Sequence, residues 1–239
     1  MWETIKALPN DKAPGPDGYT GRFYKVAWQV IKGDFVAAIG RLMQGDVGRL
    51  HLLNSAYITL IPKMAEAMDV KDFRPISLIH SFAKIVSKIL PNRLAAKLSS
   101  LVSSNQSAFV KGRCIHDNFI LVQQTAKALH GQKEPRVLLK LDISKAFDSV
   151  SWPFLMEVLR CLGLGPFWFN LLSKILMSSS TRVLVNGEPE ELICHQRGLR
   201  QGDPLSPMLF ILVMDVLNSL IKKASEQNLL QPLLRRGNS

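Results

Sequence analysis

The strongest constraint on the fold of this chain is an apolar segment that ends in a carboxylate. In residues 137–143, apolar side chains occupy every second position, and Asp142 lies on the opposite face near the end. Such alternation is typical of a β-strand with one buried face. We therefore predict a strand over residues 137–143 whose apolar face packs on helices and whose other face presents Asp142 to a cleft.

A second segment, residues 197–207 (Arg-Gly-Leu-Arg-Gln-Gly-Asp-Pro-Leu-Ser-Pro), has the composition of a polar turn that opens a buried helix. Gly202 allows the backbone to approach a ligand closely. Asp203 suits a helix cap, and Pro204 suits the first helical position. We predict a helix from Pro204 to about residue 225. These capping roles are structural and require no enzymatic function.

Further elements follow from local patterns. Residues 57–61 form an apolar run that predicts a short strand, and residues 80–102 have a helical apolar stripe interrupted by Pro91. Because proline removes a backbone hydrogen bond and clashes with the preceding turn, we expect a kink or a break there. The Asn-Gly pair at residues 186–187 predicts a hairpin between residues 181–185 and 191–195.

Composition indicates a polyanionic partner. The 239 residues carry a formal net charge of +11, and basic residues occur along the whole chain. A basic domain of this kind is typical of nucleic-acid binding, although a solvated basic surface is the alternative. The three cysteines and five histidines have no zinc-like spacing. No signal peptide and no apolar run of about 20 residues is present, so we expect an intracellular protein, nuclear or cytoplasmic, not secreted and without a membrane partner.

Two motifs together resemble a known family. Residues 142–147 (Asp-Ile-Ser-Lys-Ala-Phe) and residues 200–207 resemble, in this order, two palm motifs of reverse transcriptases. In that family the aspartate binds both catalytic Mg²⁺ ions, and the next backbone carbonyl assists. The resemblance therefore implies that Asp142 is catalytic and that Asp142 and Ile143 bind metal. The alternative is that Asp142 only caps the following helix.

The same motifs imply a nucleotide site. By this resemblance Phe147 packs under the incoming sugar as a steric gate, and Gln201 and Gly202 contact the nucleotide and the template base. A plain core aromatic is the alternative for Phe147. We expect the neighbouring Asp148 to be a helix cap or a salt-bridge partner, because the helix phase points it away from the site.

Two basic motifs extend the resemblance. Residues 60–63 and 72–78 resemble the fingers motif, in which a lysine and an arginine grip the triphosphate, here Lys63 and Arg74. Residues 106–113 (Gln-Ser-Ala-Phe-Val-Lys-Gly-Arg) resemble the next motif, which lies along template or primer. Lys111 and Arg113 would then contact nucleic acid, with a solvated basic turn as the alternative.

The resemblance covers residues 6–236 and is closest to non-LTR (LINE-type) retrotransposons of plants, through residues 12–18 (Lys-Ala-Pro-Gly-Pro-Asp-Gly). It implies an α+β fold. Residues 1–130 would form the fingers with an N-terminal extension. Residues 131–239 would form a partial palm, with inserted helices, a hairpin and antiparallel strands packed on helices, and the thumb would be absent.

The third palm motif of the family contains two adjacent aspartates, and no two aspartates are adjacent in this sequence. We therefore expect a reverse transcriptase fragment truncated before that motif. It would bind an RNA template, a DNA primer and deoxynucleotides. It would be inactive alone, since the complete family site holds two Mg²⁺ ions and the fragment lacks the second carboxylate motif that binds them. The alternatives are a non-catalytic basic nucleic-acid-binding remnant and an unstable gene fragment without function. The sequence specifies no oligomeric state.

Overall fold

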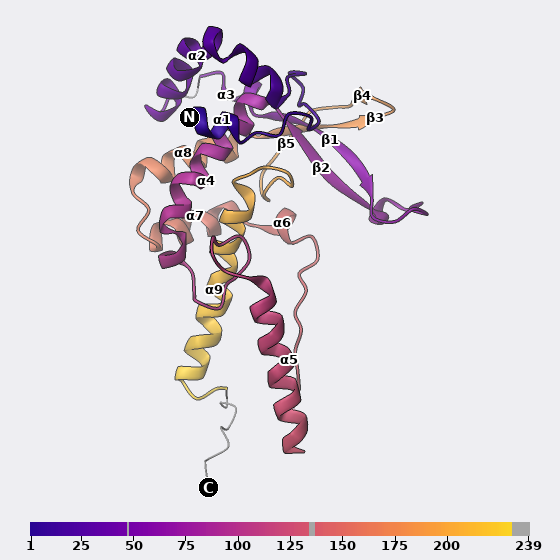
Figure 1. The fold of residues 1–239 in the computed structure, drawn as a ribbon, viewed down its shortest axis with the longest axis vertical. Helices are drawn as coiled ribbons and strands as arrows, with labels where there is room; N and C mark the ends of the chain where they lie inside the picture. Colours follow the sequence, from indigo (N-terminus) through magenta and orange to yellow (C-terminus); the bar gives the residue numbers. More distant parts are fainter. Residues whose placement is uncertain (47, 134–136, 231–239) are drawn as a thin grey trace.

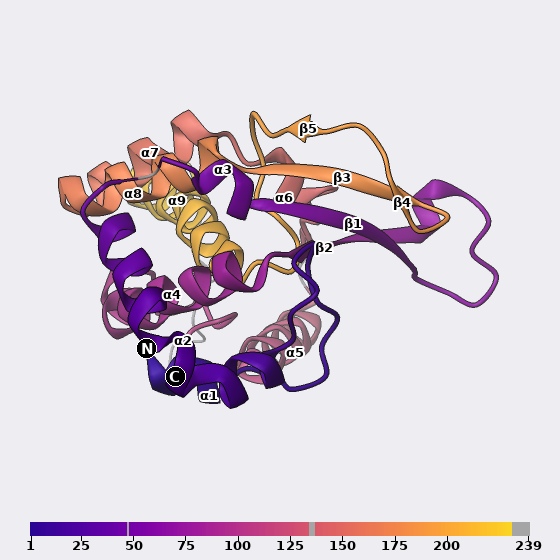
Figure 2. The same cartoon turned by 90° about the horizontal axis from the view of Figure 1, so that it is seen from above.

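The computed structural model describes residues 1–46, 48–133 and 137–230. Most helices gather into one body, and a small sheet extends from it to one side (Figure 1). Seen from above, the hairpin of residues 55–79 extends furthest from the helices (Figure 2). Helices and strands are both present, which confirms the expected α+β class.

The helical body has one apolar core. Leu90, Leu155 and Leu172 are among its fully enclosed side chains. Its helices are α1 (Trp2–Lys6), α2 (Gly21–Met43), α4 (Ser81–Leu101), α7 (Trp152–Cys161), α8 (Pro166–Met177) and α9 (Ser206–Glu226). Helix α4 continues through Pro91, so the chain does not break there. The proline side chain is buried, and this packing offsets part of the cost of the lost backbone hydrogen bond.

The sheet joins segments far apart in the sequence. Its strands are β1 (Ser55–Pro62), β2 (Phe73–Ile79), β3 (Ser180–Val185), β4 (Glu188–Pro189) and β5 (Ile193–Cys194). The order is β2-β1-β3-β4, and β5 also pairs with β3. β1 runs antiparallel to β2 but parallel to β3, with Ser55 opposite Ser180. The parallel β1–β3 pair connects the proposed fingers residues with the proposed palm residues.

Residues 137–143 do not form the predicted strand. Their backbone is irregular, and their side chains are exposed, with Leu139 74% exposed. Alternation specifies which face of a strand is apolar, but a strand also requires a hydrogen-bonded neighbour. No strand among the described residues pairs with this segment. The short helix α6 (Ala146–Ser149) follows, after Lys145 at a φ of 50°.

Helix α5 (Ile115–Gln132) projects from the body, and residues 137–145 return alongside it (Figure 1). No residue of α5 is classed as buried among those whose side chains are described, and Phe119 and Leu121 are exposed. The remaining short elements are α3 (Leu50–Leu53) and a 3₁₀ turn, η1 (Val70–Asp72). Among the helices described, none is long and apolar enough to cross a membrane.

Candidate nucleotide and nucleic-acid site

The two palm-like motifs meet through backbone hydrogen bonds. The amide of Leu199 donates to the carbonyl of Phe147 at 2.8 Å, and the amide of Gly198 donates to the carbonyl of Val150 at 2.8 Å. Gly198 has a φ of 82°, and an added Cβ would lie 2.9 Å from the carbonyl oxygen of Asp148. Only glycine fits this position without a shift of backbone. The two motifs therefore lie side by side.

The turn after Gly198 also contacts the β1–β2 hairpin. The amide of Ser77 in β2 donates to the carbonyl of Gln201 at 3.0 Å. Gly202 has a φ of 100°, and an added Cβ would lie 3.1 Å from the carbonyl oxygen of Ser77. Gln201 and Gly202 are predicted to bind the nucleotide. Through this contact they lie against the strand that carries Arg74.

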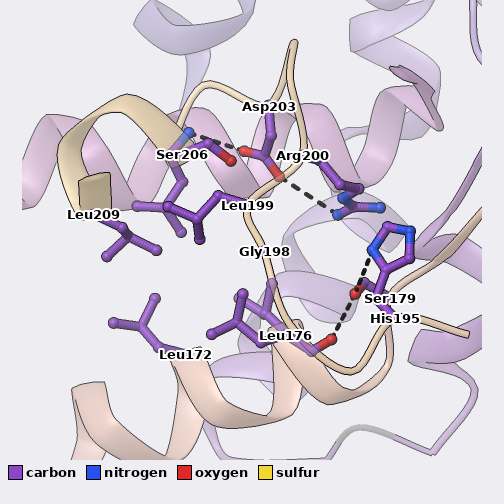
Figure 3. A pocket seen from close by; sticks show the side chains of 12 residues that line it. Leu172, Leu176, Ser179, His195, Gly198, Leu199, Arg200, Asp203, Ser206 and Leu209 are labelled. Atoms are coloured by element: carbon purple, nitrogen blue, oxygen red, sulfur yellow. Dashed lines mark hydrogen bonds and ion pairs between the residues drawn. The ribbon is translucent and has the colours of Figure 1, made fainter. Parts of the chain in front are cut away.

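A buried ion pair fixes the same turn from inside. Arg200 is 8% exposed and Asp203 is 7% exposed, and Nη2 of Arg200 lies 3.4 Å from Oδ2 of Asp203. The Asp203 carboxylate also accepts a hydrogen bond from the amide of Leu205 at 2.9 Å. In Figure 3 the two charged side chains point toward one another. They stand beside a small cavity of about 20 Å³, large enough for about one water molecule.

Asn54 extends this network and was not singled out by the sequence. Its carbonyl accepts a hydrogen bond from Nη1 of Arg200 at 2.9 Å. Its side-chain amide donates to the carbonyl of Ile175 at 2.6 Å and to Oγ of Ser178 at 2.9 Å. The end of helix α8, the start of β1 and the turn are thereby held together. A single asparagine before a strand carries no pattern that predicts such a role.

The electrostatics of this region follow from burial. Burial lowers the pKa of Arg200, and the charge of Asp203 and its hydrogen bond counteract that shift. Burial, and then the positive charge of Arg200, lower the pKa of His195, which favours a neutral imidazole. The two ring nitrogens of His195 lie 3.3 Å from Oγ of Ser179 and 3.1 Å from Oγ1 of Thr181. His195 is therefore hydrogen-bonded to Thr181 in β3 and to Ser179 directly before that strand.

A cleft of about 140 Å³ with both polar and apolar lining opens beside the turn. It is lined by Ile58, Pro75, Ser77, Asp148, Thr181, His195, Arg197, Gly198, Leu199, Arg200 and Gln201. Asp148 is among the lining residues and approaches Gly198 through its backbone. The expectation that its side chain is a helix cap or a salt-bridge partner stays a prediction. Asp148 lies more than 50 positions before Gln201 in the sequence. The backbone contacts of Gly198 and Leu199 with residues 147–150 bring the two segments together.

Phe147 is half-buried at the edge of the core. Its ring stacks on Phe210 of α9, with ring centroids 4.7 Å apart and an interplanar angle of 16°. Core packing is thus one role of Phe147, and its role as a sugar gate stays a prediction.

Lys63 and Arg74 lie at the far end of the hairpin. Arg74 is opposite Ile61, and the amide of Lys63 donates to the carbonyl of Asp72 at 2.8 Å. Both side chains are exposed, and Nζ of Lys63 donates to the carbonyl of Lys71. The hairpin therefore presents both cations on one element, as a triphosphate grip requires.

Asp142 and Ile143 lie in the exposed, irregular segment before α6. Across the described ranges, no group of three or more histidine, cysteine, aspartate or glutamate side chains gathers as a metal site. One carboxylate and one carbonyl are too few protein ligands to hold two Mg²⁺ ions. The described residues alone therefore do not fit the complete two-metal site of the family.

Lys111 and Arg113 differ in their surroundings. Lys111 is exposed. The guanidinium of Arg113 donates to the carbonyls of Ser103 and Gln106, at 2.5 and 2.7 Å, and to that of Ser99 at 3.1 Å. Arg113 therefore holds its own loop, and Lys111 has the freer side chain for contact with a phosphate.

In this α+β fold, a glycine-containing turn joins a basic hairpin to an acidic, aromatic motif. This arrangement is expected for the fingers and palm of a polymerase. Residues 61–231 match the family model described as reverse transcriptase (RNA-dependent DNA polymerase). This match covers more than half of the chain, and the chain therefore belongs to the reverse transcriptase family.

Curated relatives agree with this assignment. The chain is 30% identical over 222 residues to the transposon TX1 uncharacterized 149 kDa protein of Xenopus laevis, a match that covers 92% of this chain and 17% of the relative. It is 32% identical over 204 residues to the retrovirus-related Pol polyprotein of the type-2 retrotransposable element R2DM of Drosophila melanogaster, covering 85% and 19%. A type-1 element R2 polyprotein of Popillia japonica is 30% identical, covering 86% and 28%. The chain thus spans between about a sixth and just over a quarter of these relatives.

Proposed function

We propose that this chain serves as the reverse transcriptase domain of a non-LTR (LINE-type) retrotransposon and binds an RNA template, a DNA primer and deoxynucleotides. The observation that carries this proposal is the docking of the turn at Gly198–Gly202. This turn contacts the Phe147–Val150 segment on one side and β2 on the other. Residues of three segments that resemble family motifs thereby line one cleft.

The roles of individual residues follow from this geometry. Lys63 and Arg74 would bind the triphosphate from the hairpin, because both cations are exposed on one element. Gln201 would face the base, since it lines the cleft. Asp142 and the carbonyl of Ile143 would supply one part of a magnesium site.

A second candidate function is non-catalytic nucleic-acid binding. It is favoured by the charge of +11 and by the lack of a metal-ligand cluster within the described ranges. The two candidates share a nucleic-acid interface but differ in chemistry. Because these 239 residues alone are expected to be inactive in either case, primer extension on an RNA template distinguishes the two only for a chain completed with the paired-aspartate motif.

We expect a purified polypeptide of these 239 residues to extend no primer with Mg²⁺ or Mn²⁺. Its sequence contains no adjacent aspartates, and Asp142 alone leaves two divalent ions poorly coordinated. The measurement is RNA- and DNA-templated extension of a labelled primer, with a complete reverse transcriptase as the positive control. Template-dependent product that disappears in Asp142→Ala would contradict this prediction.

We expect nucleic-acid binding that weakens steeply with salt. If about four phosphates are neutralised, log K should fall against log salt with a slope of roughly −3 to −4. The measurement is fluorescence anisotropy with a labelled primer–template at several salt concentrations. Lys111→Ala should make the slope about one unit shallower. Lys6→Ala is the matched control, because Lys6 pairs with Glu3 on α1. A slope near zero, or no binding at low salt, would refute the interface.

A further inference from the structure

The loop between α4 and α5 holds an aromatic ring in an unusual position. Phe109 has a φ of 58°, a left-handed backbone conformation that bulky side chains rarely adopt. Its side chain is nevertheless not enclosed, since Phe109 is 60% exposed. Its neighbours Ser107 and Val110 are buried. The loop therefore accepts backbone strain at a residue whose ring faces solvent.

The first half of this loop is anchored to α9. The carboxylate of Asp215 accepts two hydrogen bonds from the amide of Ser103, at 3.1 and 3.2 Å, and one from its hydroxyl at 3.0 Å. Asn218 donates to the same hydroxyl at 2.6 Å. Asn105 in turn donates to Asn218 at 2.8 Å.

The second half is anchored by Arg113. Its guanidinium binds the carbonyls of Ser103, Gln106 and Ser99, so it ties both ends of the loop to helix α4. The amide of Ala108 donates to the side chain of Gln106 at 3.0 Å, directly before the strained residue. These hydrogen bonds fix the loop in a conformation in which Phe109 is largely exposed to solvent.

Strain that persists in an anchored backbone points to function. We propose that Phe109 is a stacking platform for a nucleobase in an unpaired stretch of nucleic acid. An exposed aromatic face stacks on any base, and a cation beside it binds the adjoining phosphate. Lys111, exposed two residues further on, supplies that cation. The charge of +11 favours a polyanionic occupant over an apolar protein segment. This inference rests on the proposed nucleic-acid-binding function.

The test uses the full 239-residue chain and a short single-stranded RNA that carries 2-aminopurine, whose fluorescence falls on stacking. Phe109→Ala should weaken binding of this RNA roughly tenfold or more and abolish the quenching, because stacking on one aromatic contributes on that scale. The salt slope should stay unchanged, since no charge is lost. Lys111→Ala should instead make the slope about one unit shallower. Phe109→Trp should preserve both binding and quenching.

A stability measurement separates binding from packing. Phe109→Gly removes the strained conformation, so its melting temperature should equal or exceed that of the wild type while RNA binding falls. Phe119→Ala is the matched control, because Phe119 is 66% exposed but lies in the regular helix α5. That variant should bind the RNA as the wild type does.

Three results would overturn the inference. One is unchanged RNA binding and quenching in Phe109→Ala. Another is a fall of melting temperature in Phe109→Gly with RNA binding intact, which would assign the ring to protein packing. The third is absence of nucleic-acid binding by the wild type at low salt, which would also remove the proposed function. The first two results leave that function standing, so the two failures are distinguishable.

Discussion

Replacement of Asp203 by alanine should lower the free energy of unfolding by about 3–5 kcal/mol, since it leaves the buried Arg200 without its counter-charge. Arg200 is 8% exposed, so its charge has little access to bulk water. The hydrogen bond to the amide of Leu205 is lost as well. For a chain of this size, the melting temperature should fall by about 10 °C or more.

The control is another ion pair three residues apart. Glu157 and Arg160 form an exposed pair on α7, and Glu157→Ala should leave the melting temperature nearly unchanged. Thermal unfolding followed by circular dichroism measures both variants. Equal melting temperatures for Asp203→Ala and the wild type would show that the turn is not held by this network.

Phe147→Ala should increase ribonucleotide use relative to deoxynucleotide use by roughly a hundredfold, because the ring would no longer obstruct the 2′-hydroxyl. A factor of this size corresponds to about 2.7 kcal/mol at 1.36 kcal/mol per tenfold change. The measurement requires an active chain. We therefore specify a chimaera in which residues 1–239 are joined to the paired-aspartate segment of an active family member, assayed with both nucleotide types.

Core packing provides the contrasting expectation. Because Phe147 stacks on Phe210, its removal also leaves a cavity that costs up to about 3–5 kcal/mol of stability. Phe210→Ala disrupts the same stack but leaves the ring of Phe147 in place. It should therefore destabilise the chimaera with little change in sugar selectivity. If Phe147→Ala lowers stability and leaves the selectivity ratio unchanged, Phe147 is a core aromatic only.

Local patterns predicted the elements whose stability is local. The helix expected from Pro204 to about residue 225 is α9, Ser206–Glu226, and the hairpin after the Asn-Gly turn is present as β3, β4 and β5. Glycine and proline specify turns through their own backbone preferences, so these predictions needed no knowledge of the partner. The resemblance predicted that Gln201 and Gly202 contact the nucleotide and the template base. Backbone contacts hold their turn beside residues 147–150, and the contact with a nucleotide stays a prediction.

Non-local features were not predictable in this way. The parallel pairing of β1 with β3 depends on contacts between residues more than 120 positions apart. The segment 137–143 has the alternation of a strand but no strand neighbour among the described residues. The role of Asn54 depends on its burial, that of Asp148 on a close backbone contact, and that of Phe109 on a left-handed φ. None of these properties is visible in the order of residues alone.

The decisive experiment for the proposed function is RNA-templated primer extension by the chimaera, with and without Asp142→Ala, after thermal unfolding has shown that both are folded. We expect extension by the parent chimaera and its loss, by several orders of magnitude, in Asp142→Ala, since this carboxylate is the proposed metal ligand. A folded parent that makes no product, or an Asp142→Ala variant that extends the primer as well as the parent, would contradict the assignment of this chain as the catalytic core of a reverse transcriptase.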